Sequence, residues 1–224
     1  MKIISSWSGG KDSALACYRA MKENHTVRSL LNLVSAREKR CCFHGTAPAL
    51  LADQARCIGI PLVQREMGEE MGDYERDFKE AVLELKKQGH EGMVFGDIYL
   101  DEHREWVERV CGDIGVVPLE PLWNNDPRRV IEEFLDAGFR AVIVSCKEDL
   151  GRDFAGRELD REALERLERL GMCPCGENGE YHTIVVDGPI FKKRIKIQKS
   201  RPVLKDGFWR HWALDIQAYT VEEP

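Results

Sequence analysis

The 224-residue sequence lacks any apolar run long enough to cross a bilayer, which excludes a transmembrane helix and a membrane partner. Its first residues, MKIISSW, lack the basic segment, apolar segment and cleavage site of a secretory signal, so we expect a cytoplasmic protein. It has no Cys-x-x-Cys pair, which argues against a zinc ribbon. It also lacks a basic excess: the net charge of −6 argues against nucleic acid as a dedicated partner.

Hydrophobic residues are 43% and charged residues 32% of the chain, so a core can form without disulfides. The eight cysteines are therefore expected to be thiols or ligands. Cys17, Cys111 and Cys146 stand at apolar positions typical of a core. Two further pairs, Cys41-Cys42 and Cys173-x-Cys175, have a spacing that leaves open whether they bind a metal or remain thiols.

Short apolar segments alternate with amphipathic ones over the first 119 residues. Strands are predicted at residues 2–7, 27–35, 61–65, 92–96 and 116–119. Helices are predicted at residues 13–24, at 47–58, between an Asp73 cap and Gly89, and between an Asp101 cap and Gly115. The pattern predicts a doubly wound α/β domain of the Rossmann type, with a five-stranded parallel sheet and ligands at the carboxyl ends of its strands.

The turn-rich segment 121–127 marks a boundary, which predicts one domain over residues 1–123 and a smaller α+β domain over residues 124–224. Asp126 and Pro127 are predicted to open a helix that ends at Gly138. A strand at 140–145, a loop at 146–159 and a helix at 160–170 follow, and the alternative for this strand is that it extends the first sheet. Segments 183–187 and 190–198 are predicted to pair around a turn, and 209–219 forms one more strand.

The segment Ser8–Ser13, SGGKDS, lies between the first predicted strand and the first predicted helix. Its two glycines allow a tight turn and let backbone amides approach an anion. The helix N-terminus and Lys11 add positive potential, and Ser8 and Ser13 add hydroxyl donors. Asp12 suits either helix capping or a Mg²⁺ ion. The spacing matches neither the Walker A loop nor the dinucleotide motif, yet it predicts a phosphate-binding loop.

This segment resembles the PP-loop of the N-type ATP pyrophosphatases. The resemblance implies that ATP is cleaved between its α and β phosphates, and that AMP is left on a carboxylate or carbonyl oxygen. Preorganised amides would stabilise the charge that develops on the leaving pyrophosphate. Mg²⁺ would bridge the phosphates.

The segment 176–183, GENGEYHT, places two carboxylates, an imidazole, an amide and a hydroxyl within eight residues. Alternation in the strand that follows predicts Glu180 and His182 on one side. Asn-Gly is also a strong turn signal, so this chemistry alone leaves a solvated turn as an equal alternative.

The two motifs together resemble the diphthine–ammonia ligase family, whose typical second motif reads GEGGEFET. The resemblance extends to Phe43-His44, Gly96-Asp97-Ile98, the run from Asp101 to Arg109, Pro121-Leu122-Trp123, Gly156-Arg157 and Cys173-Pro174. It implies an ATP-dependent ligase that adenylates the carboxylate of diphthine on elongation factor 2 and lets ammonia displace AMP.

The resemblance also implies roles for single residues. The phosphates and nucleotide would be bound by Ser8, Gly9, Gly10, Lys11, Asp12, Ser13, Ser35, His44, Gly96 and Asp97. The acceptor would be bound by Glu177, Asn178, Glu180, Tyr181, His182 and Thr183. The catalytic residues would be Lys11, Asp12, Glu177, Glu180 and His182. ATP and Mg²⁺ are the expected cofactors, with Asp12 as the metal ligand.

Asn178 and His182 depart from the glycine and glutamate of the typical motif. A histidine in place of an acid changes which substrate charge is favoured. The GENGEYHT version resembles a side branch for which a role near cobalamin metabolism has been suggested. The alternatives are therefore amidation of another carboxylate, such as a cobalamin-related small molecule, a tRNA-modifying PP-loop enzyme, or a non-catalytic nucleotide sensor. The sequence leaves open whether the protein forms a homodimer. It also leaves open whether the basic stretch 189–211 is a docking surface or a solvated strand face.

Overall fold

The computed structural model describes residues 1–42, 44–68, 71–206 and 210–223, so Phe43 of the predicted motif lies outside the described residues. Internal contacts divide the chain into two units. The first comprises Met1–Ser8 and Asp12–Asn124, and the second comprises Gly9–Lys11 and Asn125–Pro224. No helix in the described ranges combines the length and the apolar character needed to span a membrane.

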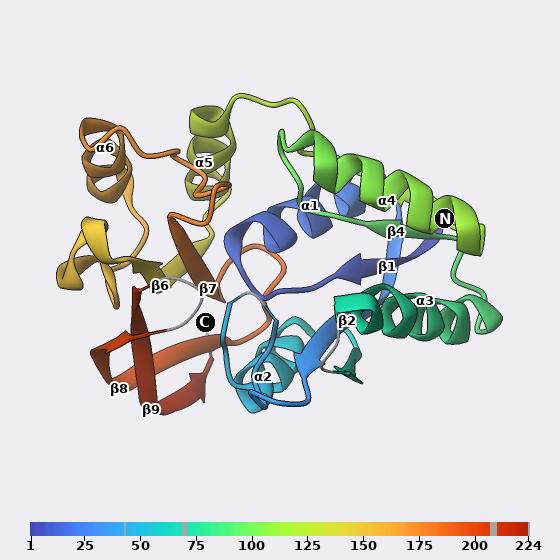
Figure 1. Cartoon of the computed structure of the whole chain (residues 1–224), viewed down its shortest axis with the longest axis horizontal. Helices are drawn as coiled ribbons and strands as arrows, with labels where there is room; N and C mark the ends of the chain where they lie inside the picture. The colour runs from blue at the N-terminus through green and yellow to red at the C-terminus, as the bar shows by residue number, and fades with distance from the viewer. Residues whose placement is uncertain (43, 69–70, 207–209, 224) are drawn as a thin grey trace. The chain divides into compact units, whose positions relative to one another are not determined.

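The first unit is built on a five-stranded parallel sheet in the order β3-β2-β1-β4-β5 (Figure 1). Its strands are β1 (Lys2–Ser6), β2 (Thr26–Ser35), β3 (Leu62–Met67), β4 (Gly92–Val94) and β5 (Val117–Leu119). The predicted doubly wound α/β fold is confirmed. The strand order reverses between β1 and β4, and ligands of such sheets bind outside the carboxyl ends of strands at this switch point.

Four helices connect the parallel strands: α1 (Lys11–Lys22), α2 (Pro48–Ile58), α3 (Met71–Lys87) and α4 (Asp101–Ile114). Right-handed crossovers put α1 and α2 on one face of the sheet and α3 and α4 on the other. On the second face, Phe78 and Val82 of α3 and Val107 and Val110 of α4 are buried in one cluster with Met93 of β4. The apolar faces of these two helices therefore pack together against the sheet.

The helix ends in the first unit follow the predicted glycines more closely than the predicted aspartates. Gly59 and Gly115 end α2 and α4 in the left-handed conformation that glycine adopts most easily. The two Asp caps were predicted wrongly. Asp101 is the first residue of α4, after Leu100, and Asp73 lies in the first turn of α3. Both carboxylates lie in the first turn of a helix, where the helix dipole favours negative charge, which explains why these aspartates occur near the helix starts.

The second unit holds a four-stranded antiparallel sheet in the order β7-β6-β9-β8 and two helices. Its elements are α5 (Pro127–Asp136), β6 (Arg140–Lys147), α6 (Arg161–Arg169), β7 (Tyr181–Asp187), β8 (Arg194–Lys205) and β9 (His211–Glu222). The predicted α+β character is confirmed, and β6 belongs to this sheet. The stretch predicted as loop contains two 3₁₀ turns, Glu148–Leu150 and Arg152–Phe154.

The predicted pairing of the strands around Gly188-Pro189 is wrong. β7 pairs with β6, and β8 pairs with β9. At the end of β7 the chain runs over the stacked rings of Phe134 and Phe139, whose centroids are 5.0 Å apart. A Cβ on Gly188 would lie 2.2 Å from the Phe139 ring, so this glycine serves close packing rather than a hairpin turn.

Two aspartates cap the helices of the second unit as side-chain acceptors. Asp126 accepts a hydrogen bond from the Arg129 N–H at 3.0 Å, which confirms the predicted start of α5. Asp160 accepts one from the Ala163 N–H at 2.7 Å at the start of α6.

Candidate active site

The end of β1 is fixed immediately before the glycine loop. Trp7 is buried, and its indole N–H donates to Oε1 of Gln54 at 2.8 Å. Its backbone N–H donates to the Leu31 carbonyl at 2.8 Å, and its carbonyl accepts from the Asn32 amide at 2.9 Å. The chain therefore leaves the sheet in a defined direction, which is what a preorganised ligand loop requires.

The start of α1 packs tightly against the chain that follows β4. The Ser8 hydroxyl donates to the Ser13 hydroxyl at 3.2 Å. A Cβ on Gly96 would lie 2.8 Å from the carbonyl carbon of Asp12 and 2.9 Å from the Ser13 nitrogen. Glycine is therefore required at position 96, and the structure brings Asp12, Ser13 and Gly96 together at the switch point of the sheet.

Gly9–Lys11 belong by their contacts to the second unit, where β7 binds them. The Val185 N–H donates to the Gly9 carbonyl at 2.9 Å, and the Lys11 N–H donates to the Thr183 hydroxyl at 3.0 Å. The Lys11 ammonium lies 4.8 Å from the ring centroid of Tyr181. Gly9–Lys11 of the first motif therefore lie against β7 of the second motif within one unit, although about 170 residues of sequence separate them.

The loop before β7 is organised by Glu180. This side chain is 5% exposed and accepts hydrogen bonds from the Cys173 N–H at 3.3 Å, the Asn178 N–H at 3.0 Å and the Asn178 amide at 3.2 Å. β7 begins at Tyr181, so strand alternation does not extend to Glu180, and its carboxylate turns into the loop instead. His182 is half-buried and pairs in register with Ser145 of β6.

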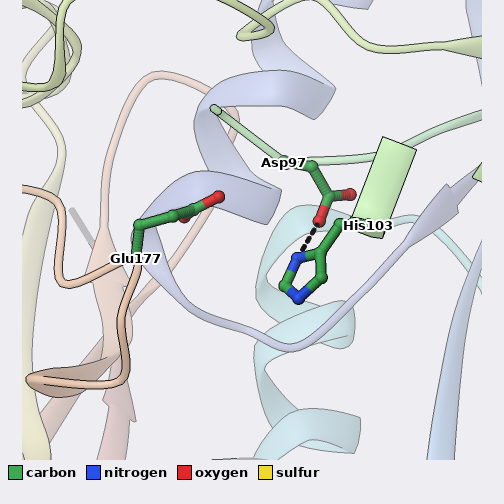
Figure 2. Close-up of side chains that lie close together, drawn as sticks. All are labelled: Asp97, His103 and Glu177. Atoms are coloured by element: carbon green, nitrogen blue, oxygen red, sulfur yellow. Dashed lines mark hydrogen bonds and ion pairs between the residues drawn. The ribbon is translucent and has the colours of Figure 1, made fainter. Parts of the chain in front are cut away.

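A second group of polar side chains follows β4 and β5 in the first unit. Asp97 Oδ1 is hydrogen-bonded to His103 Nδ1 at 3.0 Å, as Figure 2 shows. The Arg104 guanidinium lies 5.0 Å over the Trp123 ring. Burial, together with the nearby charge of Asp97, raises the pKa of Glu120 to about 7. Within the described parts of the chain, the buried Oε1 of Glu120 has no hydrogen-bond partner.

Glu120 was not predicted from the sequence. The available signal was its position directly after the apolar segment VVPL, because the carboxyl ends of parallel strands are where ligands bind. A carboxyl group that titrates near neutral pH in such a place is a candidate functional group.

The predicted nucleotide residues near the end of β2 are held by their own turns. The Ser35 hydroxyl accepts from the Glu38 N–H at 3.1 Å, and the His44 N–H donates to the Cys42 carbonyl at 2.8 Å. Burial raises the pKa of Cys41 to about 12 and also raises that of Cys42, so both side chains are protonated thiols at neutral pH.

All eight cysteines are described and are free thiols. Cys17, Cys111 and Cys146 are buried, as predicted. Cys175 is buried as well, and its thiol donates to the Pro127 carbonyl at 2.9 Å.

Three residues of the basic stretch, Arg194, Lys196 and Arg201, pair with acids on the neighbouring strand β9. Arg201 pairs with Asp215 at 3.1 Å, and Arg194 pairs with Glu222 at 3.4 Å. These cross-strand pairs support a solvated strand face rather than a nucleic-acid surface. A cavity of about 430 Å³ beside this face is lined by residues of β6, β7, β8 and β9, and its lining contains no residue predicted for the site.

Comparisons with known proteins match the whole chain. Residues 1–118 match the family model of the diphthamide synthase N-terminal domain, and residues 126–221 match that of the C-terminal domain. A diphthine–ammonia ligase of Danio rerio is 28% identical over 91% of this chain and 89% of that protein. The Homo sapiens protein of the same name is 29% identical over 91% of this chain and 85% of that protein.

The chain spans a smaller part of some relatives. The diphthine–ammonia ligase of Schizosaccharomyces pombe is 29% identical over all of this chain but over 40% of that protein. A solved structure, a predicted subunit of tRNA methyltransferase from Methanocaldococcus jannaschii, has 16% identity and a TM-score of 0.46 over 84% of this chain and 97% of that one, a likeness too distant to carry an argument. Because the two family models together match nearly every residue, the chain belongs to the diphthamide synthase family of enzymes.

Proposed function

We propose that this enzyme forms an amide in two ATP-dependent steps. A carboxylate oxygen attacks the α phosphorus of ATP, the α–β phosphoanhydride bond breaks, and pyrophosphate leaves. Ammonia then attacks the acyl carbon and AMP leaves. The acceptor that we propose is diphthine on elongation factor 2, since the named relatives are diphthine–ammonia ligases. The observation that carries the proposal is the hydrogen bond from the Lys11 N–H to Thr183, which joins the glycine loop to the second motif.

We assign phosphate binding to Ser8–Ser13 and the first turn of α1. A helix N-terminus and a lysine supply positive potential where the leaving pyrophosphate gains negative charge. Donors held in place before the reaction stabilise that charge without further reorganisation. The nucleotide contacts proposed for Ser35, His44, Gly96 and Asp97 follow from their places after β2 and β4.

Asp12 is the side chain that fits Mg²⁺ in this loop. It is a half-buried carboxylate in the first turn of α1, and Ser8 and Ser13 add oxygen atoms nearby. Oxygen donors are the ligands that Mg²⁺ prefers. When bound, the ion would neutralise part of the phosphate charge.

We assign the acceptor contacts to the loop that Glu180 organises. Glu177 and Asn178 lie at its turn, and His182 follows on β7. An imidazole is suited to accept the proton that ammonia loses on forming the amide. Glu180 and Thr183 position these groups, because their oxygen atoms accept the N–H groups of the loops. Because the proposed substrate is carried by a translation factor, we propose a cytoplasmic location for the enzyme.

The test combines ATP, ammonium and single candidate acceptors, including elongation factor 2 that bears diphthine. We expect AMP and pyrophosphate only when a true acceptor is present, and a hydroxamate when hydroxylamine replaces ammonium.

Substitution His182→Glu, which restores the acid of the typical motif, tests acceptor choice: if His182 selects another carboxylate, this variant gains activity on diphthine. AMP formation that does not depend on any acceptor would overturn the proposal.

A further inference from the structure

The lysine of the glycine loop is buried in an unusual way. Lys11 is 3% exposed, although lysine side chains are almost never fully buried unless a partner compensates the charge. Its ammonium lies 4.8 Å from the centroid of the Tyr181 ring, within the range of a cation–π contact. The negative face of the ring therefore contributes to keeping this cation at its position.

The Tyr181 ring is itself held in place. It is 1% exposed, and its hydroxyl donates to the Pro174 carbonyl at 2.5 Å. A Cβ on Gly176 would lie 2.9 Å from the ring, so the loop packs on the ring as closely as glycine allows. A ring fixed from the loop and from β7 offers the ammonium one defined position.

Residues 181 and 183 lie on the same face of β7, because side chains two apart in a strand point the same way. Thr183 accepts the Lys11 backbone N–H, and Tyr181 lies under the Lys11 ammonium. One face of one strand therefore fixes both ends of the lysine.

We propose that Tyr181 is a positioning residue that orients Lys11 toward the phosphates of ATP, and not a contact of the acceptor. This inference rests on the proposed function, since it presumes that the loop binds ATP. Without the ring, the four-carbon side chain must be ordered when the nucleotide binds, which weakens ATP binding by about tenfold.

The experiment measures equilibrium binding of ATP to the full chain and its variants. Tyr181→Phe keeps the ring and should bind ATP within about twofold of the parent enzyme. Tyr181→Leu removes the ring and should bind about tenfold more weakly. Phe154→Leu is the matched control: Phe154 is a buried ring 4.5 Å from the Arg166 guanidinium in the same unit, and its loss should leave ATP binding unchanged.

A double-mutant cycle separates positioning from general damage. In the background of Lys11→Ala, Tyr181→Leu should cause no further loss of ATP affinity, because the residue it acts through is absent. Equal losses in both backgrounds would overturn the inference. If Tyr181→Leu does not fold, Tyr181→Met keeps an apolar side chain of similar length and carries the same expectations.

Steady-state kinetics give an independent readout. Tyr181→Leu should raise the KM for ATP and leave the KM for the acceptor unchanged. A rise in the acceptor KM alone would assign Tyr181 to the acceptor and overturn the inference, while the proposed function would stand. A parent enzyme that binds no ATP would overturn both.

Discussion

Glu120 in the first unit and Glu180 in the second unit occupy opposite surroundings. Glu180 is 5% exposed and accepts hydrogen bonds from two backbone N–H groups and one side-chain amide. Glu120 carries a buried oxygen without a partner in the described ranges, and Asp97 adds a second negative charge nearby. One carboxylate fixes a loop, whereas the other is poised to change its protonation near neutral pH.

The same contrast extends to the proposed roles. Polar groups of the second unit hold the glycine loop and the loop before β7, so their substitution should damage structure and activity together. Glu120, which follows β5, has a buried oxygen without a partner in the described ranges, so its substitution should change pH dependence more than stability.

Replacing Glu180 should have the largest effect. Glu180→Ala removes the buried carboxylate that accepts the Cys173 and Asn178 N–H groups and the Asn178 amide, which we expect to lower the free energy of unfolding by about 2–4 kcal/mol. Urea denaturation measures this loss. Glu165→Ala, at an exposed position of α6, is the control and should stay within about 0.5 kcal/mol. A Glu180→Ala variant as stable as the control would show that Glu180 does not stabilise its loop, and the contrast with Glu120 would fail.

Thr183→Val should have the next largest effect. The methyl group keeps the volume but removes the acceptor of the Lys11 N–H, which we expect to cost about 1–2 kcal/mol and to weaken ATP binding. Isothermal titration with ATP measures the affinity. Thr220→Val on β9 is the matched control. Unchanged ATP affinity in Thr183→Val would show that the hydrogen bond between Lys11 and Thr183 does not contribute to ATP binding.

Glu120→Gln should change the pH dependence of stability. A carboxyl whose pKa is raised from 4.5 to about 7 binds its proton more tightly in the folded state, so folding loses stability as pH rises through that window. Water screens part of the effect because the group is half-buried, and we expect the variant to be about 1 kcal/mol more stable than the parent at pH 8.5.

The gain from Glu120→Gln should disappear at about pH 4.5, where both side chains are neutral. Unfolding free energies at the two pH values measure it. Glu105→Gln, at an exposed position of α4, is the control. A gain of equal size at both pH values would contradict the assigned protonation change.

The smallest effect compares two helix starts, one in each unit. Asp126→Ala removes a side chain that accepts the Arg129 N–H and should cost about 1 kcal/mol. Asp101→Ala removes a first-turn carboxylate and should cost a few tenths, through its interaction with the helix dipole. Thermal denaturation at low ionic strength ranks the two. The reverse order would show that the acids in the first unit are the better caps.

The first unit was predictable because its order depends on local patterns. The inner strands β1, β2 and β4 are mainly buried, and right-handed crossovers restrict the order of the strands. The strand pairing of the second unit was not predictable, because antiparallel strands pair according to tertiary packing between segments that are far apart in the sequence. The sequence Gly188-Pro189 was interpreted as a hairpin turn. In the structure Gly188 packs so closely on the Phe139 ring that no side chain would fit there.

The site was predictable in its residue types and not in its contacts. SGGKDS and GENGEYHT are visible in the sequence because they concentrate glycines and polar groups. The bond between Lys11 and Thr183 spans 172 positions and follows from the fold alone. Alternation along the strand predicts Glu180 and His182 on one side, yet β7 begins at Tyr181 and the Glu180 carboxylate accepts N–H groups of its own loop. These contacts could not be predicted from the sequence, and the catalytic role of Glu180 stays a prediction.

The fate of ATP tests the central claim most directly. The enzyme is incubated with ATP, ammonium and elongation factor 2 that bears diphthine, and the nucleotide and phosphate products are separated. Cleavage beside the α phosphate predicts AMP and pyrophosphate in equal amounts, formed only with the acceptor present. Formation of ADP and orthophosphate instead would contradict the account.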